Sequence, residues 1–125
     1  MRRRPSLHRR SQRDRPRVKR GEVWTASASG HAVKLRPVVV IQDDRFDATA
    51  SVTLCALTSD PTEAPLFRVL VEPSETNGLR AASRIMVDKI TTVPREKLGQ
   101  RIGQLADEDL LRLNRAVLLF LGLAG

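Results

Sequence analysis

The residues best suited to chemistry are one arginine and two hydroxyl side chains that lie at the ends of two largely apolar segments. Arg36 precedes the run 37–41, and Thr58 and Ser59 follow the run 52–57. A guanidinium presents a fixed fork of donors that fits phosphate oxygens and can stabilise negative charge in a transition state. Taken alone, these residues also fit an ordinary surface arginine and polar turn residues. A cation beside hydroxyl groups at two strand ends nevertheless predicts a site that can hold a phosphate.

Strands must hold these residues in place. Four branched residues in a row, 38–41, are typical of a strand covered on both faces. Pro37 is tolerated only at the first residues of such a strand or on an edge, so Arg36 lies where the strand begins. The sequence predicts this strand over 36–42, further strands at 22–26, 51–57, 66–71, 84–89 and 100–104, and one helical turn over 94–98.

The C-terminal segment changes to a helical period. Its apolar residues recur as the stripe of an amphipathic helix: Leu110, Leu113, Val117, Phe120 and Leu121. Three carboxylates, residues 107–109, crowd the start of the helix, where the positive end of its dipole favours them. Leu111 and Leu118 broaden the stripe, so the helix either packs on the sheet by two faces or contributes to a dimer interface. Short strands with this helix predict a mostly β (α+β) fold with a small, strongly curved sheet or barrel.

Composition limits the class of protein. With 125 residues and 41% apolar content, the chain suffices for one domain with a modest core. Its longest apolar run, 116–121, is far shorter than the roughly 20 residues that span a bilayer, so no membrane association is expected. The single cysteine, Cys55, cannot form an intrachain disulfide, which predicts a small core residue and a cytoplasmic protein. With only His8 and His31 as histidines, no metal site and no cofactor are expected.

The net charge of +8 arises at the N-terminus. Residues 1–20 hold nine arginines and one lysine against Asp14, whereas residues 21–125 hold 12 positive and 13 negative groups. Because Leu7 and Val18 are its only aliphatic residues, segment 1–20 is predicted to be a disordered, arginine-rich tail before a single domain over 21–125. Such an arm would attract nucleic-acid phosphates without sequence preference. The alternative is that the tail is dispensable, or that translation starts later.

Several ordered segments resemble the MazF/PemK family of toxins. They are Arg20-Gly21-Glu22-Val23-Trp24, residues 36–42 and Ala56-Leu57-Thr58-Ser59, followed by 77–79, 83–90, 92–93, 98, 102–103 and 121–123. The resemblance covers roughly residues 20 to 125. It implies a small SH3-like barrel, formed by a curved antiparallel sheet with a C-terminal helix, and a homodimer.

The resemblance also implies a function. The chain would be the toxin of a type II toxin–antitoxin system: a sequence-selective, metal-independent endoribonuclease that cleaves single-stranded RNA, including mRNA, by 2′-hydroxyl attack and so inhibits translation and growth. The arginine that opens this strand is catalytic in the family and the threonine is its partner, which assigns these roles to Arg36 and Thr58. Ser59 offers a further catalytic hydroxyl. The protein partner would be a small cognate antitoxin whose disordered acidic segment covers the groove.

Two further residues are candidates for acid/base catalysis. His31 lies in a loop whose family counterparts contact RNA, and its near-neutral pKa suits proton transfer. The alternative is a solvated loop histidine. Asp88 lies where some family members place an acidic residue implicated in acid/base work. The alternative for Asp88 is an ion pair with Lys89 or Arg84.

RNA recognition is expected mainly from two loops. Loop 27–35 is long for a hairpin connection, and both it and loop 60–65 would read unstacked bases. The residues expected to bind RNA are Ser29, Gly30, His31, Lys34, Asp60 and Lys89. Trp24 could stack on a base, although a strand tryptophan more often lies in a core or interface.

Other functions remain open for the same fold. Some toxins of this barrel family poison DNA gyrase, but those lack the arginine and Thr-Ser arrangement. A second alternative is a non-cleaving nucleic-acid-binding protein led by the basic arm. A third is a member that binds its antitoxin and regulates without cutting RNA. Loss of cleavage on removal of Arg36 would separate the nuclease from all three.

Overall fold

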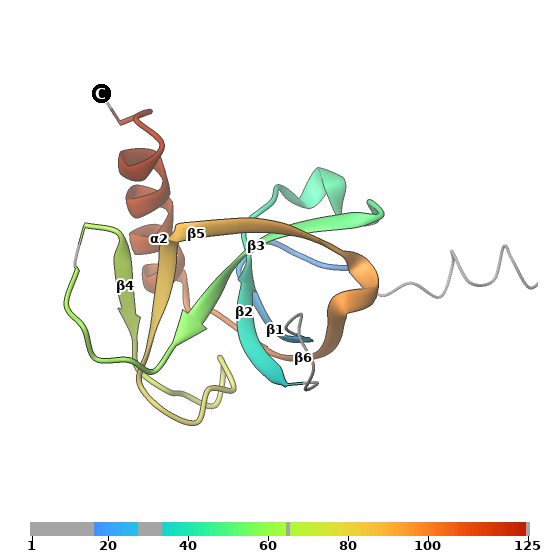
Figure 1. The fold of residues 1–125 in the computed structure, drawn as a ribbon, viewed down its shortest axis with the longest axis horizontal. Coiled ribbons are helices and arrows are strands. Elements are labelled where there is room, and N and C mark those ends of the chain that lie inside the picture. Colours follow the sequence, from blue (N-terminus) through green and yellow to red (C-terminus); the bar gives the residue numbers. More distant parts are fainter. Residues whose placement is uncertain (1–16, 28–33, 65, 125) are drawn as a thin grey trace, which may run out of the picture.

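The computed structural model describes residues 17–27, 34–64 and 66–124, which form one curved sheet and a C-terminal helix (Figure 1). The elements, in chain order, are β1 (Glu22–Ser27), β2 (Leu35–Val40), η1 (Asp44–Phe46), β3 (Ser51–Thr58), β4 (Arg68–Val71), β5 (Ser83–Pro94), η2 (Arg95–Lys97), β6 (Leu98–Gln104) and α2 (Asp107–Phe120), where η marks a 3-10 helix. The six strands pair antiparallel in the order β4-β5-β3-β2-β1-β6. This architecture confirms the predicted mostly β fold with a C-terminal helix.

Strand β5 is the element that departs most from expectation. The sequence predicted a strand over 84–89, but β5 has 12 residues and reaches Pro94. Its first half pairs with β4, its second half pairs with the start of β3, and the β3–β5 register shifts between Cys55 and Leu57. The irregularity bends the strand, so β5 arches across the sheet in Figure 1. Asp88 and Lys89 interrupt the alternation of apolar residues, so the sequence pattern gave no sign that the strand continues beyond residue 89.

The curved sheet separates two cores. One lies between the sheet and α2 and includes Val39, Cys55 and Leu113, all fully buried. The other lies on the opposite face and includes Val38, Val40 and Trp24. Consecutive residues of β2 therefore face different cores, which confirms the prediction that this strand is covered on both faces. Trp24 is 4% exposed and donates its indole N–H to Glu22 at 3.0 Å, so it packs in the core and is closed to a base.

Helix α2 packs on the sheet by one face only. Leu113 and Ala116 are buried, and Leu110 and Val117 are partly buried against the same core. The helix begins after Ala106 without a side-chain cap, and carboxylates fill its first turn as the sequence indicated. The large apolar residues left exposed at this end of the chain are Leu111, Leu118, Leu119, Phe120, Leu121 and Leu123. Within the described part of the chain, no helix has the length and apolar character needed to span a bilayer.

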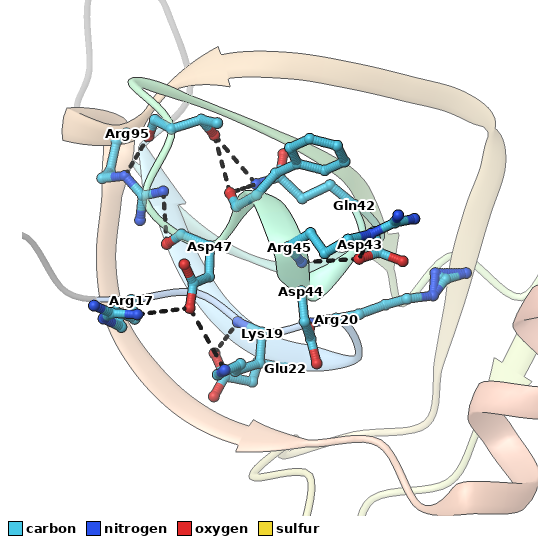
Figure 2. Close-up of polar contacts among 12 residues, drawn as sticks. Arg17, Lys19, Arg20, Glu22, Gln42, Asp43, Asp44, Arg45, Asp47 and Arg95 are labelled. Atoms are coloured by element: carbon cyan, nitrogen blue, oxygen red, sulfur yellow. Dashed lines mark hydrogen bonds and ion pairs between the residues drawn. The ribbon is translucent and has the colours of Figure 1, made fainter.

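Residues 17–20 belong to the folded domain, whereas the sequence placed them in the tail. Val18 is 1% exposed in the second core. Figure 2 shows the ion pairs that hold its neighbours: Asp47 accepts from Arg17 at 3.1 Å and lies 3.5 Å from Lys19. The Arg20 side chain donates to the carbonyl of Ile41 at 2.9 Å. The remainder of the predicted tail, residues 1–16, lies outside the described residues.

The connection between β2 and β3, which contacts residues 17–20, is also bound by Arg95 of η2. Arg95, 3% exposed, donates to the carbonyls of Thr49 and Asp47 at 2.7 and 3.0 Å (Figure 2). Residues 17–20 and η2 thus both contact the connection between β2 and β3. This polar network lies apart from the cavity described below, so we assign it to folding.

Candidate active site

A cavity of about 520 Å³ opens where β2 begins and β3 ends. Its lining residues are Thr25, Leu35, Arg36, Pro37, Leu57, Thr58, Ser59, Gly78, Leu79, Arg80, Ala81, Ser83 and Ile102. We call it the Arg36 cavity. Three of the predicted catalytic residues, Arg36, Thr58 and Ser59, thus line one cavity, as expected from their positions at strand ends.

The strand register explains why Arg36 and Thr58 meet. Strands β2 and β3 are antiparallel neighbours in which Val38 pairs with Ala56. Two residues earlier on β2 is Arg36, and two residues later on β3 is Thr58. Because side chains two residues apart share a face of a strand, both extend from the same face at the same level. Pro37 lies beside them, near the start of β2, where the sequence required it.

The Arg36 guanidinium is available to a ligand. Its side chain is exposed at the cavity, and among the residues that the structure describes it has no hydrogen-bond or ion-pair partner. The lining residues include no carboxylate. An unpaired cation in a cavity without acids favours an anion such as a phosphate.

The segment after β3 is held by its own side chains. The Thr58 hydroxyl accepts a hydrogen bond from the backbone N–H of Asp60 at 3.1 Å, which leaves its own proton free to donate. The Asp60 carboxylate accepts from the hydroxyl and backbone N–H of Thr62 at 2.7 and 3.0 Å. These hydrogen bonds hold the pKa of Asp60 below its ordinary value. Asp60 is therefore an ionised acceptor at neutral pH, suited to a base amino group and unsuited to a phosphate.

Asp88 and Lys89 are not among the residues that line the Arg36 cavity. Asp88 lies on β5, where its carboxylate is 3.5 Å from the Nε of Arg68, and both atoms are buried. The sequence analysis left two interpretations of Asp88 open, and one of them was an ion pair. The structure shows an ion pair, but the partner of Asp88 is Arg68 rather than Lys89 or Arg84. Lys89 is exposed on the same strand.

The remaining predicted RNA-binding residues divide into two groups. Lys34 is exposed directly before β2, at the end of the strand that carries Arg36. Ser29, Gly30 and His31 lie outside the described residues.

Cys55 is not suited to act as a nucleophile. Burial, and secondarily the charge of Asp88, raises the pKa of the Cys55 thiol to about 12, so the sulfur stays protonated and unreactive at neutral pH. This agrees with the predicted core role. Among the residues that the structure describes, no three His, Cys, Asp or Glu side chains gather as a metal site would require.

Comparison with known proteins identifies the family. A family model described as the PemK-like, MazF-like toxin of type II toxin–antitoxin systems matches residues 19–121. The chain belongs to this family. The match confirms the family that the sequence segments indicated.

Individual relatives agree with the assignment. A probable endoribonuclease MazF of Mycolicibacterium smegmatis is 52% identical over 109 residues, which cover 86% of this chain and all of that protein. A solved endoribonuclease from a mycobacterial species matches with a TM-score of 0.73 at 22% identity, over 90% of this chain and 98% of that one. Another, solved in complex with its cognate antitoxin, matches with a TM-score of 0.71 at 24% identity, over 85% and 96% of the two chains. The two structures support the fold.

The sequence left out three polar residues of this MazF/PemK-like cavity. Thr25 and Ser83 contribute hydroxyls, and Arg80 contributes a second guanidinium. Arg80 follows Asn77-Gly78. These two residues predicted a turn, but they did not show that the turn packs against β6. Finding these residues required the pairing of segments far apart in the chain.

A second arginine-rich concavity of the toxin lies between α2 and the edge of the sheet. It encloses about 330 Å³ and is lined by Glu63, Leu66, Arg68, Val69, Leu70, Arg84, Arg112, Arg115, Ala116 and Leu119. We call it the helix-side hollow. Unlike Arg36, three of its arginines have acidic partners: Arg68 pairs with Asp88, Arg84 with Glu63 at 3.3 Å, and Arg112 with Asp109 at 2.9 Å.

Proposed function

We propose that this toxin is a sequence-selective endoribonuclease that cleaves single-stranded RNA, including mRNA, without a metal ion and thereby inhibits translation and growth. The observation that carries the proposal is the Arg36 guanidinium at the level of Thr58, which, within the part of the chain that the structure describes, has no partner and lies in a cavity lined by no carboxylate. Relatives of this chain are named endoribonucleases.

The reaction needs no group from outside the protein and RNA. The ribose 2′-hydroxyl loses its proton and attacks the adjacent phosphorus, the bond to the 5′-oxygen breaks, and that oxygen takes up a proton. The products are a 2′,3′-cyclic phosphate and a free 5′-hydroxyl. Negative charge grows on the phosphorane oxygens, where Arg36 would stabilise it more strongly than in the ground state.

The hydroxyl groups would orient the phosphate. Thr58 has a free proton to donate to a phosphate oxygen, because its hydroxyl acts as an acceptor toward Asp60. Ser59, the next residue, offers a second donor at the same rim. For proton transfer, His31 remains the proposed group, and the pairing of Asp88 with Arg68 favours a structural role for Asp88.

Base recognition would come from the segments around the cavity. Asp60 is an ionised acceptor that can bind an amino group of a base, and Lys34 and Lys89 are exposed cations. Loops 27–35 and 60–65 would contribute the remaining contacts, including those proposed for Ser29, Gly30 and His31. Single-stranded bases are the part of RNA that such loops can read.

We also propose that the protein acts as a homodimer. The exposed apolar side of α2, with Leu111 and Leu118 half exposed, supports this, because monomers rarely expose contiguous apolar surface of this kind. Leu66, which lines the helix-side hollow together with Leu119, is also 69% exposed and adds to this apolar surface. Leu118→Glu should shift the protein toward the monomer in sedimentation equilibrium, and an unchanged dimer would place the interface elsewhere.

The proposed protein partner is a small antitoxin with a disordered acidic segment, and the proposed compartment is the cytoplasm. Carboxylates of such a segment would be attracted to the unpaired arginines of the Arg36 cavity. A solved structure of similar fold is a complex with its cognate antitoxin. The single cysteine, buried and free, fits a reducing compartment.

The decisive experiment incubates purified protein with a long single-stranded RNA in the presence of EDTA. Wild type should give discrete cuts with 5′-hydroxyl ends, and Arg36→Ala, folded to the same extent, should give none. Mapping the ends would identify the recognition sequence. Absence of cuts by a folded wild type freed of antitoxin would reject the nuclease and favour the gyrase-poison or binding alternative. Cuts that disappear with EDTA would reject the metal-free mechanism.

A further inference from the structure

The loop between β4 and β5 is built around a buried asparagine. Asn77 is 2% exposed. Its side-chain oxygen accepts from the backbone N–H groups of Ser74 and Leu79 at 3.0 and 2.9 Å, and its amide donates to the carbonyl of Glu72 at 2.9 Å. Three backbone groups of one loop are thereby tied to a single side chain. Leu79, next to this network, is buried in the core.

The same loop is pressed against β6. Gly78 has a positive φ of 71°, and a Cβ there would lie 2.1 Å from the carbonyl oxygen of Ile102. A Cβ on Gly103 would lie 2.4 Å from the carbonyl carbon of Asn77. The backbone N–H of Gln104 donates to the carbonyl of Thr76 at 2.9 Å. Only glycine permits such close approach, so the loop is held at a defined position on the sheet.

Arg80 extends from this fixed base into the Arg36 cavity. It is exposed, it lines the cavity, and within the described part of the chain it has no hydrogen-bond or ion-pair partner. The cavity therefore holds two unpaired guanidiniums, Arg36 from β2 and Arg80 from the β4–β5 loop. No carboxylate among the described lining residues offsets their charge.

Two like charges in one cavity are best satisfied by two anionic groups. A phosphodiester carries one negative charge, whereas two successive linkages of an RNA strand carry two. The volume of about 520 Å³ exceeds that of a single phosphate and falls in the range of ligand pockets. Leu35, which lines the cavity and is 58% exposed, adds apolar surface that a sugar or base could cover.

We propose that Arg80 is a second phosphate-binding residue, which holds an RNA backbone phosphate next to the one that is cleaved. The assignment rests on the proposed nuclease function. Arg36 acts on the reacting phosphate, because it lies at the level of Thr58. Arg80 contacts a linkage that does not react, so it contributes equally to binding of the substrate and the transition state, and its loss raises KM rather than lowering kcat.

The test uses an oligonucleotide that spans a mapped cut and three proteins: wild type, Arg80→Ala and Arg45→Ala. Arg45 is a matched control, since it is an exposed arginine outside the cavity that pairs with exposed Asp43. Arg80→Ala should raise KM about tenfold with kcat within about twofold, the effect of losing one charge-assisted contact. The slope of log KM against log salt should fall by roughly 0.7, the contribution of one phosphate on a single strand. Arg45→Ala should change neither value.

A neutral-linkage scan locates the contact. Replacing phosphates singly by methylphosphonates should weaken wild-type binding at one linkage beside the cut, and Arg80→Ala should be insensitive to that same replacement. Equal behaviour of Arg80→Ala and Arg45→Ala, or a fall in kcat at constant KM, would overturn the inference. If wild type itself does not cut RNA, the nuclease proposal fails first, so the two failures are distinguishable.

Discussion

The Arg36 cavity and the helix-side hollow are both rich in arginine, but they differ in the state of those arginines. In the cavity, Arg36 and Arg80 are unpaired among the described residues and no carboxylate lines the wall. In the hollow, Arg68, Arg84 and Arg112 each pair with an acid, and only Arg115 has no partner among the described residues. Arginine content therefore does not distinguish a phosphate site from a structural ion-pair cluster. The distinction lies in which guanidiniums have a carboxylate within ion-pair distance.

The energetic consequence is different for the two regions. An anion entering the hollow must compete with carboxylates already within 3.5 Å of three of its four arginines. An anion entering the Arg36 cavity meets open donors and displaces only water. Because charge-assisted hydrogen bonds are roughly twice as strong as neutral ones, the open donors favour binding in the cavity.

The largest expected effect is the loss of cleavage in Arg36→Ala. Removing one preorganised donor from a developing oxyanion costs about 10²–10³ in kcat. The melting temperature should stay unchanged, because Arg36 is exposed and has no partner among residues 17–27, 34–64 and 66–124. The matched variant in the hollow, Arg112→Ala, should keep wild-type kcat. Equal losses of kcat in the two variants would remove the distinction between the regions.

A smaller loss is expected from Thr58→Val, which removes a hydroxyl at nearly constant volume. One lost hydrogen bond to the phosphate is worth about 1.4 kcal/mol, or roughly tenfold in kcat. Thr53→Val is the control on the same strand, since the Thr53 hydroxyl pairs with that of Thr92 at 2.7 Å. Single-turnover cleavage should fall for the first variant alone. A comparable fall in both would point to a general disturbance of β3.

The sequence placed Arg36 and Thr58 together at strand ends, and that placement depends on local structure. Arg36 and Thr58 lie at strand ends, and strand ends follow from the short-range pattern of branched residues, Pro37 and polar breaks. The two neighbouring antiparallel strands then bring these ends together. Arg80 could not be found in this way, because its position depends on the contact of Gly78 with Ile102, far away in the chain.

The fold shows the same limit. The sequence located every strand, but not the extent of β5, whose bend comes from a register shift with β3. It assigned residues 17–20 to the tail because their charge dominates their composition. Their partners Asp44 and Asp47 lie some distance along the chain, and Val18 fills a core that only the folded sheet creates. Contacts between residues far apart in the chain, rather than local secondary-structure propensity, determine both the extent of β5 and the position of residues 17–20.

Asp88→Asn tests whether the ion pair between Asp88 and Arg68 of the helix-side hollow serves folding or catalysis. Breaking a fully buried pair costs about 3–5 kcal/mol. The side chains of Arg68 and Asp88 remain 16% and 23% exposed, so a loss of about 1–2 kcal/mol in unfolding free energy is expected. The folded variant should retain kcat. A double-mutant cycle with Arg68→Met should reveal coupling between the two residues. Unchanged stability with lost cleavage would instead support the acid/base role considered for Asp88.

The smallest expected effect belongs to Asp109→Asn on helix α2. Asp109 lies in the first turn, where a negative charge favours the helix dipole, and it accepts from Arg112 at 2.9 Å. Its loss should lower the unfolding free energy by about 0.5–1 kcal/mol and leave cleavage unchanged. Glu108→Gln removes a charge from the same turn, and Glu108 itself has no ion pair among the described residues. The difference between the two variants in urea denaturation isolates the ion pair. If they are equally destabilised, the Asp109–Arg112 pair contributes nothing, and the contrast between paired and unpaired arginines would rest on Arg68 and Arg84 alone.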